Sequence, residues 1–328
     1  AAALEEGVVS ENDRFYCGGS RVIDGVKIRC WRSVGHGSQD LQEGLANSCN
    51  CVFMELAMRL GVDKFYDYMQ KFGLGQKTGI SLAGEVGGIL MDKSIVKRVD
   101  LARMGFGHAV AVTPIQLLTA VDGIVNGGKL TTPTIVSEAV DVFGNQIYHS
   151  SHEVKRQVVS QSTSQRVCKL LSKATNKHGD YTFVEGYDVG GKTGTAQKYD
   201  ATGHIAQGKY ISSFIGTFPA ADPDYLVMVM VDEPSAGAYY GSVVAAPYGK
   251  EIFSGIFKYL DIKKQNETTI IELVEMPDLV GKTLTDAAIE LKRLGISFET
   301  DGEGGIVLKQ LPPAGTKVAK GDTIILIT

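Results

Sequence analysis

Val189-Gly190-Gly191-Lys192-Thr193-Gly194-Thr195-Ala196 is a glycine-rich run that carries one lysine and two hydroxyls directly before a β-type segment. Its glycines leave room for another backbone or a ligand to approach closely. Lys192 would supply a fixed positive charge, and Thr193 and Thr195 would supply hydroxyl and amide donors. The run therefore predicts the edge of a site for an acidic, extended ligand. A turn with a solvated lysine is the alternative that the run alone leaves open.

Length and composition indicate a globular chain with one large and one small domain. With 328 residues, of which 44% are hydrophobic and 21% charged, the chain can bury a sizeable core. The formal net charge of −4 gives no basis for a nucleic-acid partner. No uninterrupted apolar run of about 18 residues occurs, so the sequence predicts no membrane span within these residues.

The first seven residues, Ala1 to Gly7, read as the last turns of a helix that ends at a glycine. Nothing before them would start that helix. We therefore expect the chain to begin inside a domain, with a preceding part packed against it. A natural start with a frayed helix is the alternative.

The loop-rich segment from residue 14 to residue 51 holds four of the five cysteines. Three of its thiols and one imidazole form the kind of ligand set that a closed tetrahedral zinc site uses. The candidate zinc ligands are Cys17, Cys30, His36 and Cys49. Disulfides, for instance Cys17 with Cys30, and buried unligated thiols are the alternatives.

Helical phase favours Cys49 over Cys51 as the fourth ligand. The apolar residues after Asn47 recur with helical spacing until Gly61. Cys49 falls on that buried stripe, whereas Cys51 falls in phase with Glu55, nearer the polar flank.

Ser48 and Asn50 flank Cys49 at the expected start of the same helix, where both could serve as capping groups. Their order relative to Lys192 favours a second interpretation. A Ser-x-Asn element followed far downstream by Lys-Thr-Gly gives two of the three motifs of serine β-lactamases and penicillin-binding proteins.

With the run Gly105 to Leu117, which contains Val112-Thr113-Pro114-Ile115-Gln116-Leu117, these motifs resemble the transpeptidase domain of class B penicillin-binding proteins over residues 1 to about 260. The order of elements agrees with an α+β fold, an antiparallel sheet flanked by helices as in serine β-lactamases and transpeptidases. The sequence itself predicts helices over 114–126, 163–177 and 247–260 and a hairpin of strands 210–218 and 225–232. Cys168 is expected in the core.

The resemblance implies a peptidoglycan D,D-transpeptidase that cross-links cell walls through an acyl-enzyme and is a target of β-lactams. It implies that Ser48 relays protons to the leaving amine and that Asn50 holds the substrate amide carbonyl. Lys192 would steady the hydroxyls and the substrate carboxylate. Thr193 and Thr195 would bind that carboxylate, and Gly194 would leave room for the substrate strand. The Thr195 amide would form half of the oxyanion hole.

Two departures from the family pattern stand out. The family carries a Ser-x-x-Lys nucleophile tetrad before the Ser-x-Asn element, and no such tetrad precedes Ser48. Ser94-Ile95-Val96-Lys97 has the spelling but follows Ser48 and lies in a polar loop, so we interpret it as coincidence. We expect residues 1–260 to be the portion after the nucleophile, which alone should not catalyse. Gly105 stands where relatives commonly have serine.

The C-terminal residues resemble a PASTA module, a small βαββ unit. The resemblance is carried by Pro277-Asp278-Leu279-Val280-Gly281, by a helix over 285–294, and by Pro312-Pro313-Ala314-Gly315 between strands 306–310 and 323–327. We expect a transpeptidase domain at 1–260, a polar linker at 261–269 and the PASTA domain at 270–328. The small module is expected to dock or to be mobile.

The resemblance also implies partners and a place in the cell. It implies peptidoglycan stem peptides and β-lactams as ligands, a membrane anchor in a segment outside this chain, and work on the extracytoplasmic face of the membrane. A glycosyltransferase, division-complex or sporulation-complex partner is implied as well, since PASTA-tailed members of this kind serve sporulation or division in Gram-positive bacteria. The alternatives are a non-catalytic muropeptide or β-lactam sensor on the same fold, and a hydrolytic carboxypeptidase or β-lactamase.

Overall fold

The structure is a computed structural model that describes residues 1–328 except 152, 178–183, 201, 203 and 265–272. The chain forms two compact units. Unit 1 comprises Ala1–Asp13, Ile23–Val26 and Phe53–Cys168, and unit 2 comprises Arg14–Val22, Lys27–Val52 and Lys169–Thr328. Residues 265–269 of the expected linker lie outside the described residues.

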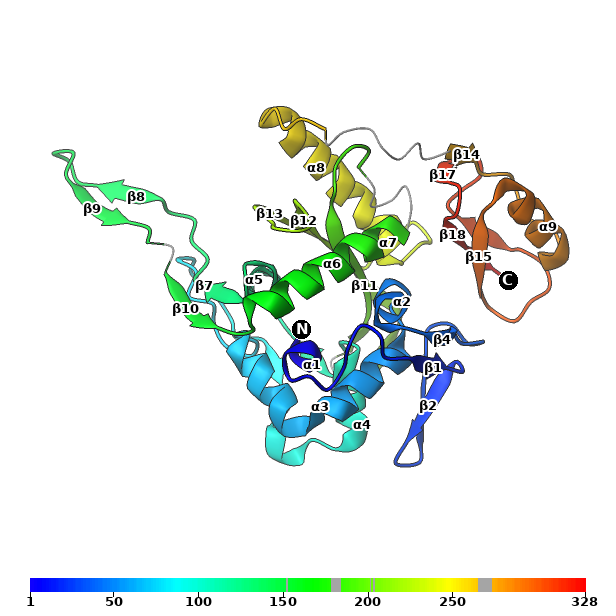
Figure 1. Cartoon of the computed structure of the whole chain (residues 1–328), viewed down its shortest axis with the longest axis horizontal. Helices are drawn as coiled ribbons and strands as arrows, with labels where there is room; N and C mark the ends of the chain where they lie inside the picture. The colour runs from blue at the N-terminus through cyan, green and yellow to red at the C-terminus, as the bar shows by residue number, and fades with distance from the viewer. Residues whose placement is uncertain (152, 178–183, 201, 203, 265–272) are drawn as a thin grey trace. The chain divides into compact units, whose positions relative to one another are not determined.

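The three-stranded antiparallel sheet of unit 2 carries the Lys-Thr-Gly run (Figure 1). Its strand order is β11-β12-β13, with β11 at Gly190–Tyr199, β12 at Ile205–Phe218 and β13 at Tyr225–Asp232. The expected hairpin is confirmed, and its first strand begins five residues earlier than the sequence predicts. The antiparallel register runs without a bulge from Gly190 opposite Thr217 to Gln197 opposite Tyr210.

Helix α8 (Ala246–Tyr259) packs against strands β12 and β13 and builds the core of unit 2. Phe214, Phe253 and Phe257 are almost completely buried there. A Cβ atom on Gly249 would lie 2.3 Å from the Phe214 ring, so the glycine lets helix and sheet approach closely. Burial of each such ring contributes about 1.5–3 kcal/mol to folding, which fixes the sheet against the helix.

The cysteine-rich segment of unit 2 folds into short strands and one helix. Strand β1 (Phe15–Cys17) pairs with β4 (Gly37–Gln39), and β2 (Ser20–Ile23) pairs with β3 (Val26–Arg29). Helix α2 (Leu41–Ala46) follows, and its capping box is formed by Asp40 and Glu43.

The PASTA-like module of unit 2 has its own core, which includes Leu279, Leu291 and Leu326. Helix α9 (Leu284–Leu294) begins one residue before the predicted start, is capped by Thr283 and ends at the left-handed Gly295. Ala287 is fully buried because it lies four positions before Leu291 on the same helix face. The strands of the module are β14 (Leu273–Glu275), β15 (Ser297–Asp301), β16 (Lys309–Leu311), β17 (Lys317–Ala319) and β18 (Thr323–Ile327).

Unit 1 is mainly helical. Helix α3 (Asn50–Lys71) starts in unit 2 and continues through unit 1, and it is broken at Gly61, where the sequence predicts a helix end. Helix α5 (Pro114–Val125) confirms the helix predicted over 114–126, and it has Thr113 as its cap and proline at its first position. The other elements are α1 (Ala2–Glu5), β5 (Ile89–Leu90), a 3₁₀ turn (Lys93–Ile95), α4 (Arg98–Gly105), β6 (Val110–Ala111), β7 (Lys129–Thr131), β8 (Glu138–Val140), β9 (Gln146–His149), β10 (Val154–Gln157) and α6 (Gln161–Lys177).

Helix α6 begins two residues before the predicted start and crosses from unit 1 into unit 2. Cys168 on this helix is 1% exposed, which confirms it as a core residue.

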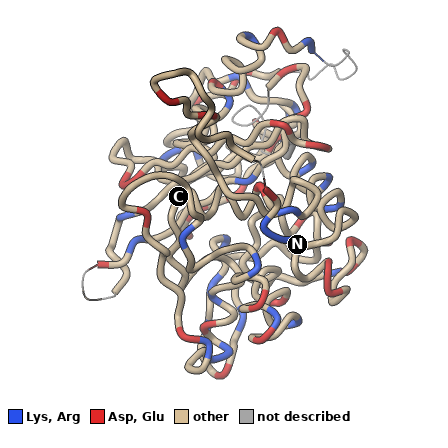
Figure 2. The backbone as a smooth tube through the Cα atoms, turned by 90° about the vertical axis from the view of Figure 1, so that its left-hand side faces the viewer, with Lys and Arg blue, Asp and Glu red and all other residues tan. Residues whose placement is uncertain are grey.

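Charges of both signs are interspersed along the described chain (Figure 2). Within the described residues, none of the helices has the length and apolarity that a bilayer crossing requires.

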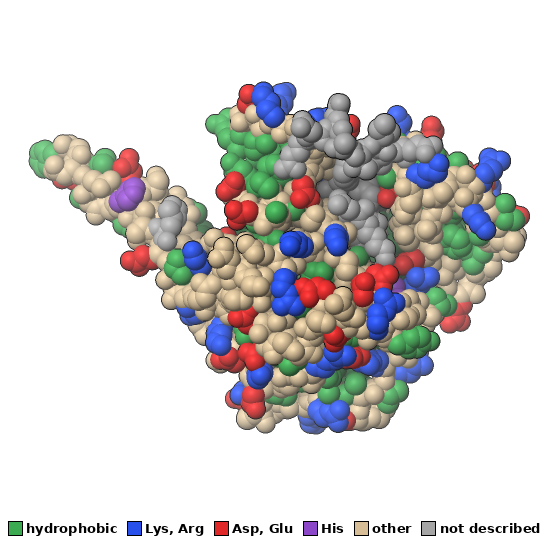
Figure 3. All heavy atoms as spheres, in the orientation of Figure 1, with side chains coloured by type: hydrophobic (Ala, Val, Ile, Leu, Met, Phe, Trp, Pro, Cys, Tyr) green, Lys and Arg blue, Asp and Glu red, His purple; other side chains and the backbone are tan. Residues whose placement is uncertain are grey.

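Strands β8 and β9 form a hairpin that projects from unit 1 with apolar side chains at its far end (Figures 1 and 3). Val142 and Phe143 at its turn are 93% and 86% exposed. The polar residues of the turn are tied locally, since the Asp141 carboxylate accepts backbone hydrogen bonds from Phe143 and Asn145.

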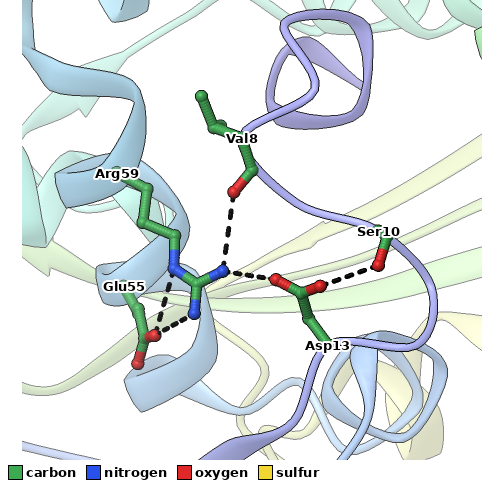
Figure 4. A network of polar contacts seen from close by, with 5 residues as sticks. All are labelled: Val8, Ser10, Asp13, Glu55 and Arg59. Carbon is green, nitrogen blue, oxygen red and sulfur yellow. Dashed lines mark hydrogen bonds and ion pairs between the residues drawn. The ribbon is translucent and has the colours of Figure 1, made fainter.

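The N-terminal segment of unit 1 is tied to helix α3 by a polar network centred on Arg59 (Figure 4). The Arg59 guanidinium forms ion pairs with Asp13 and Glu55 and donates a hydrogen bond to the Val8 carbonyl. Ser10 and Arg59, in that order, hold the pKa of the Asp13 carboxyl below its usual range. This network fixes the residues that lead into β1.

Candidate active site

The Lys-Thr-Gly run lies on the edge strand of the unit 2 sheet. Lys192, Thr193, Gly194 and Thr195 stand opposite Ile215, Phe214, Ser213 and Ser212 of β12. Among the described strands β11 pairs only with β12, so its outer edge can take a further strand. Thr193 and Thr195 share one face of β11 because side chains alternate along a strand.

Lys192 joins the two motifs that the sequence singles out. Its ammonium group donates hydrogen bonds to the Ser48 hydroxyl and to the Thr193 carbonyl, the latter at 2.9 Å. Burial lowers the pKa of Lys192 to about 8, because desolvation disfavours the charged form. The structure thus brings Ser48 and Lys192 into direct contact.

Ser48 lies at the end of helix α2 in a left-handed conformation, with φ of 48°. The Ser48 amide donates to the Leu45 carbonyl and the Cys49 amide donates to the Gly44 carbonyl. These two bonds form a Schellman motif, which glycine usually closes. A serine held in this strained conformation is typical of functional sites.

Cys49 is buried, as the sequence predicts, but it does not lie within the helix. Helix α3 begins at Asn50, so Ser48 and Cys49 lie in the link between α2 and α3. The helical spacing of apolar residues begins only at Asn50. The left-handed backbone of Ser48 changes the chain direction, so residues before Asn50 do not continue that spacing. Asn50 donates from its side chain to the Arg29 carbonyl at 3.2 Å.

Thr195 is tied to the start of helix α7 (Gly241–Val244). Its hydroxyl accepts a hydrogen bond from the Gly241 amide at 3.0 Å. A Cβ atom on Gly241 would lie 2.3 Å from the Gly194 carbonyl oxygen, so only glycine permits this approach to β11.

The structure gathers the four expected metal ligands. The ligand atoms of Cys17, Cys30, His36 and Cys49 all lie within 4.8 Å of one another. The Cys30 sulfur is 3.7 Å from His36 Nδ1. All five cysteines are free thiols, so the alternative of a Cys17–Cys30 disulfide is not what the structure has.

The four groups strongly shift one another's pKa values. Hydrogen bonds from the thiols of Cys49 and Cys51 lower the pKa of Cys30 far below its usual range. Burial lowers the pKa of His36, but hydrogen bonds with Cys30, Cys49 and Cys17 outweigh it and raise that pKa to about 10.

The prediction that Cys51 lies near the polar flank of the helix is wrong. Cys51 is 1% exposed and hydrogen bonds with Cys30 and Cys49, which raise the pKa of its thiol. The reason is again the helix start at Asn50, which makes Cys51 the second helical residue and turns it toward the cluster.

Ser94 and Lys97, which share the spelling of a nucleophile tetrad, are both exposed. Ser94 lies in a 3₁₀ turn and donates to Asp92, while Lys97 occupies the N-cap position of α4 and its backbone amide donates to Asp100. They do not share a helix face. At Gly105 a Cβ atom would lie 2.6 Å from the Phe53 carbonyl oxygen, so the packing of α4 explains the glycine.

The residues before α7 support the site but were not predicted from the sequence. The Ser212 hydroxyl donates to the Tyr239 carbonyl, and Tyr239 stacks on Tyr210 with ring centroids 4.1 Å apart. The sequence pattern that could have indicated this packing is the adjacent aromatic pair Tyr239-Tyr240 directly before Gly241.

Two protein-family models match the chain. The penicillin binding protein transpeptidase domain matches residues 1–254, and the PASTA domain matches residues 274–328.

Curated relatives agree with these matches. Stage V sporulation protein D of Bacillus subtilis is 41% identical over 99% of this chain and 51% of its own length. A probable peptidoglycan D,D-transpeptidase PenA of Neisseria meningitidis is 32% identical over 71% of this chain and 38% of its own length. The chain thus spans about half or less of these relatives.

Solved structures share the fold. Penicillin binding protein 3 of Mycobacterium tuberculosis, complexed with ampicillin, has a TM-score of 0.74 and 26% identity, over 81% of this chain and 61% of that one. The transpeptidase domain of penicillin-binding protein 3 of Burkholderia pseudomallei has a TM-score of 0.70 and 26% identity, over 81% of this chain and 78% of that one.

Proposed function

Because this chain belongs to the penicillin-binding protein transpeptidase family, we propose that it is part of a serine-type peptidoglycan D,D-transpeptidase. The observation that carries the proposal is the hydrogen bond from Lys192 to Ser48, which joins the Lys-Thr-Gly and Ser-x-Asn motifs in one site. The reaction transfers the acyl group of a D-alanyl-D-alanine stem peptide to a serine, releases D-alanine and passes the acyl group to an amine.

The outer edge of β11 is the place for the acyl donor. An extended peptide can add to this edge as a further strand, with Gly194 leaving room for it. The hydroxyls of Thr193 and Thr195 bind the terminal carboxylate, and the Lys192 ammonium attracts it electrostatically. The Thr195 amide serves as one oxyanion-hole donor, a role worth about 3–4 kcal/mol in hydrolases.

Ser48 and Asn50 act on the other end of the reacting peptide bond. The Ser48 hydroxyl, hydrogen bonded to Lys192, passes a proton to the departing D-alanine amine. Asn50 holds the amide carbonyl of the donor, and its hydrogen bond to Arg29 fixes its orientation.

The nucleophile of this transpeptidase belongs to a Ser-x-x-Lys tetrad outside residues 1–328. Support comes from the motif order of the family and from the exposed, separate positions of Ser94 and Lys97. We therefore assign binding and proton transfer, but not nucleophilic attack, to this chain.

Penicillin adduct formation tests the function. The complete protein is incubated with benzylpenicillin and its intact mass is measured. We expect one covalent adduct per protein, mapped to a serine of the tetrad. The lack of any adduct with several β-lactams would favour a non-catalytic sensor on the same fold.

The Cys17, Cys30, His36 and Cys49 cluster fits a structural zinc ion. A tetrahedral zinc with thiolate ligands sets ligand atoms about 3.5–4 Å apart, so the 4.8 Å span needs only a small contraction. His36 Nδ1 lies 3.7 Å from the Cys30 sulfur, so the ring turns this nitrogen toward the thiols, and thiolate and imidazole groups are ligands that zinc accepts. Zinc would hold Cys49 and thereby orient its neighbours Ser48 and Asn50.

Metal analysis tests this site. We expect one zinc per protein by elemental analysis and a lower melting temperature for Cys49→Ser, with Cys168→Ser as the control for loss of a buried thiol away from the cluster. Zinc-free purified protein, or an unchanged melting temperature of Cys49→Ser, contradicts the assignment.

The proposed substrate sets the location and the partners. Peptidoglycan is cross-linked outside the cytoplasmic membrane, so this part of the protein works on the extracytoplasmic face, held there by an anchor outside residues 1–328. Stem peptides and β-lactams are its ligands. A sporulation role, with a glycosyltransferase of a sporulation complex as partner, is favoured over a division role by the similarity to a stage V sporulation protein along 99% of the chain.

A further inference from the structure

The end of strand β15 in the PASTA module carries two acidic residues that contact the rest of unit 2. Glu299 forms an ion pair with Arg32 at 3.0 Å, in which the two side chains are only 12% and 27% exposed. The Asp301 carboxylate accepts hydrogen bonds from the Tyr240 hydroxyl and, at 3.3 Å, from the Tyr239 hydroxyl. Glu299 and Asp301 share one face because they are two positions apart in the strand.

A third contact comes from strand β16. The Lys309 ammonium donates a hydrogen bond to the Gly237 carbonyl at 2.7 Å. The module is therefore tied at three points, two of which lie on the short segment from Gly237 to Tyr240.

That segment is also tied to the Lys-Thr-Gly strand. Tyr240 precedes Gly241, whose amide donates to the Thr195 hydroxyl. The Tyr239 carbonyl accepts from the Ser212 hydroxyl, and Ser212 stands opposite Thr195 in the sheet register. The carboxylate of Asp301 is thus connected to the Thr195 hydroxyl through one tyrosine and one peptide unit.

Glu299 is connected to the thiol cluster through Arg32. Its partner Arg32 lies between two candidate metal ligands, Cys30 and His36, and the Arg32 backbone hydrogen bonds with the Cys30 thiol. One face of β15 therefore contacts both Tyr240, next to the Lys-Thr-Gly strand, and Arg32, next to the thiol cluster.

We propose that the docked PASTA module positions the substrate-binding Thr195 hydroxyl, and that Asp301 is the positioning residue through which it does so. The inference rests on the proposed transpeptidase function. A charge-assisted hydrogen bond from Tyr240 to Asp301 fixes the peptide unit that donates to Thr195. This fixes the direction in which the Thr195 hydroxyl presents itself to a substrate carboxylate.

The hydrogen bond between Tyr240 and Asp301 is partly buried. Burial and the hydrogen bond with Asp301 raise the pKa of Tyr240, so this phenol stays protonated and remains a donor. Because Glu299 is paired with Arg32 and Asp301 is hydrogen bonded to Tyr240, a peptidoglycan ligand would have to bind another face of the module.

Acylation kinetics of the complete protein with fluorescent penicillin test the proposal. We expect Asp301→Ala to lower the acylation rate about tenfold, since small misplacements of binding groups are costly. Glu303→Ala is the matched control, because Glu303 is an exposed acid two positions further along. Its rate should equal that of the unaltered protein. Tyr240→Phe, which keeps the ring, should reproduce the loss, and the double variant with Asp301→Ala should lose no more.

A Thr195→Ala background separates positioning from a general effect on folding. In this background Asp301→Ala should cause no further loss, because the hydroxyl that it positions is gone. Equal rates for Asp301→Ala and the unaltered protein, or a full further loss in the Thr195→Ala background, overturn the positioning role while the function stands. If the unaltered protein forms no adduct, the proposed function itself fails.

Discussion

Lys192 is the residue on which the candidate site depends, because it contacts a serine that lies 144 positions earlier in the chain. The pairing could be predicted from the sequence, since the spelling of the two motifs identifies both partners. The left-handed conformation of Ser48 could not, because serine has no strong preference for it and the Schellman bonds to Gly44 and Leu45 impose it.

The lowered pKa of Lys192 predicts a pH dependence of acylation. The ammonium is charged below pH 8 and loses its charge as the pH rises through about 8, so its attraction for a substrate carboxylate disappears there. The penicillin acylation rate of the complete protein should therefore fall above about pH 8. A base role for neutral Lys192 would produce the opposite slope.

Lys192→Arg provides the control for this titration. A guanidinium keeps its charge to a pH of about 12, so any activity that the variant retains should lack the fall near pH 8. An equal fall in both proteins would assign the titration to another group.

Strand β11 and helix α7 form the element pair that holds Thr195. The hairpin β12–β13, helices α5 and α9 and the core position of Cys168 could be predicted because they follow from local patterns, whereas α7 was not predicted. The start of α3 and the burial of Cys51 could not, because they depend on how the chain leaves α2 rather than on apolar spacing. The close approach of Gly241 to Gly194 is likewise a tertiary feature.

Gly241→Ala tests this packing. The added methyl group would meet two backbone oxygens, those of Gly194 and Ser213, at 2.3 and 2.5 Å. Neither can yield as a flexible side chain would, so α7 must move away from β11. We expect a destabilisation of about 1–3 kcal/mol in chemical denaturation, together with slower acylation by penicillin.

Gly255→Ala is the matched control on the neighbouring helix. Gly255 is exposed on α8 and its added Cβ would meet nothing within 4 Å. This variant should be more stable by about 0.5–1 kcal/mol and acylate at the normal rate. Similar behaviour of the two variants would contradict the packing argument.

The whole molecule combines a transpeptidase part and a PASTA part. Both could be recognised from the sequence, because each keeps short motifs with a fixed spelling. The contact of Asp301 with Tyr240 could not be recognised, since it joins residues 61 positions apart that carry no shared pattern.

Product analysis tests the central claim most directly. The complete protein is incubated with a peptide that ends in D-alanyl-D-alanine and with an amine acceptor, and the products are identified by mass spectrometry. A transpeptidase releases D-alanine and joins the shortened peptide to the acceptor, and Lys192→Ala should abolish both products. Release of D-alanine with hydrolysis alone would identify a carboxypeptidase, and full activity of Lys192→Ala would contradict the assigned site.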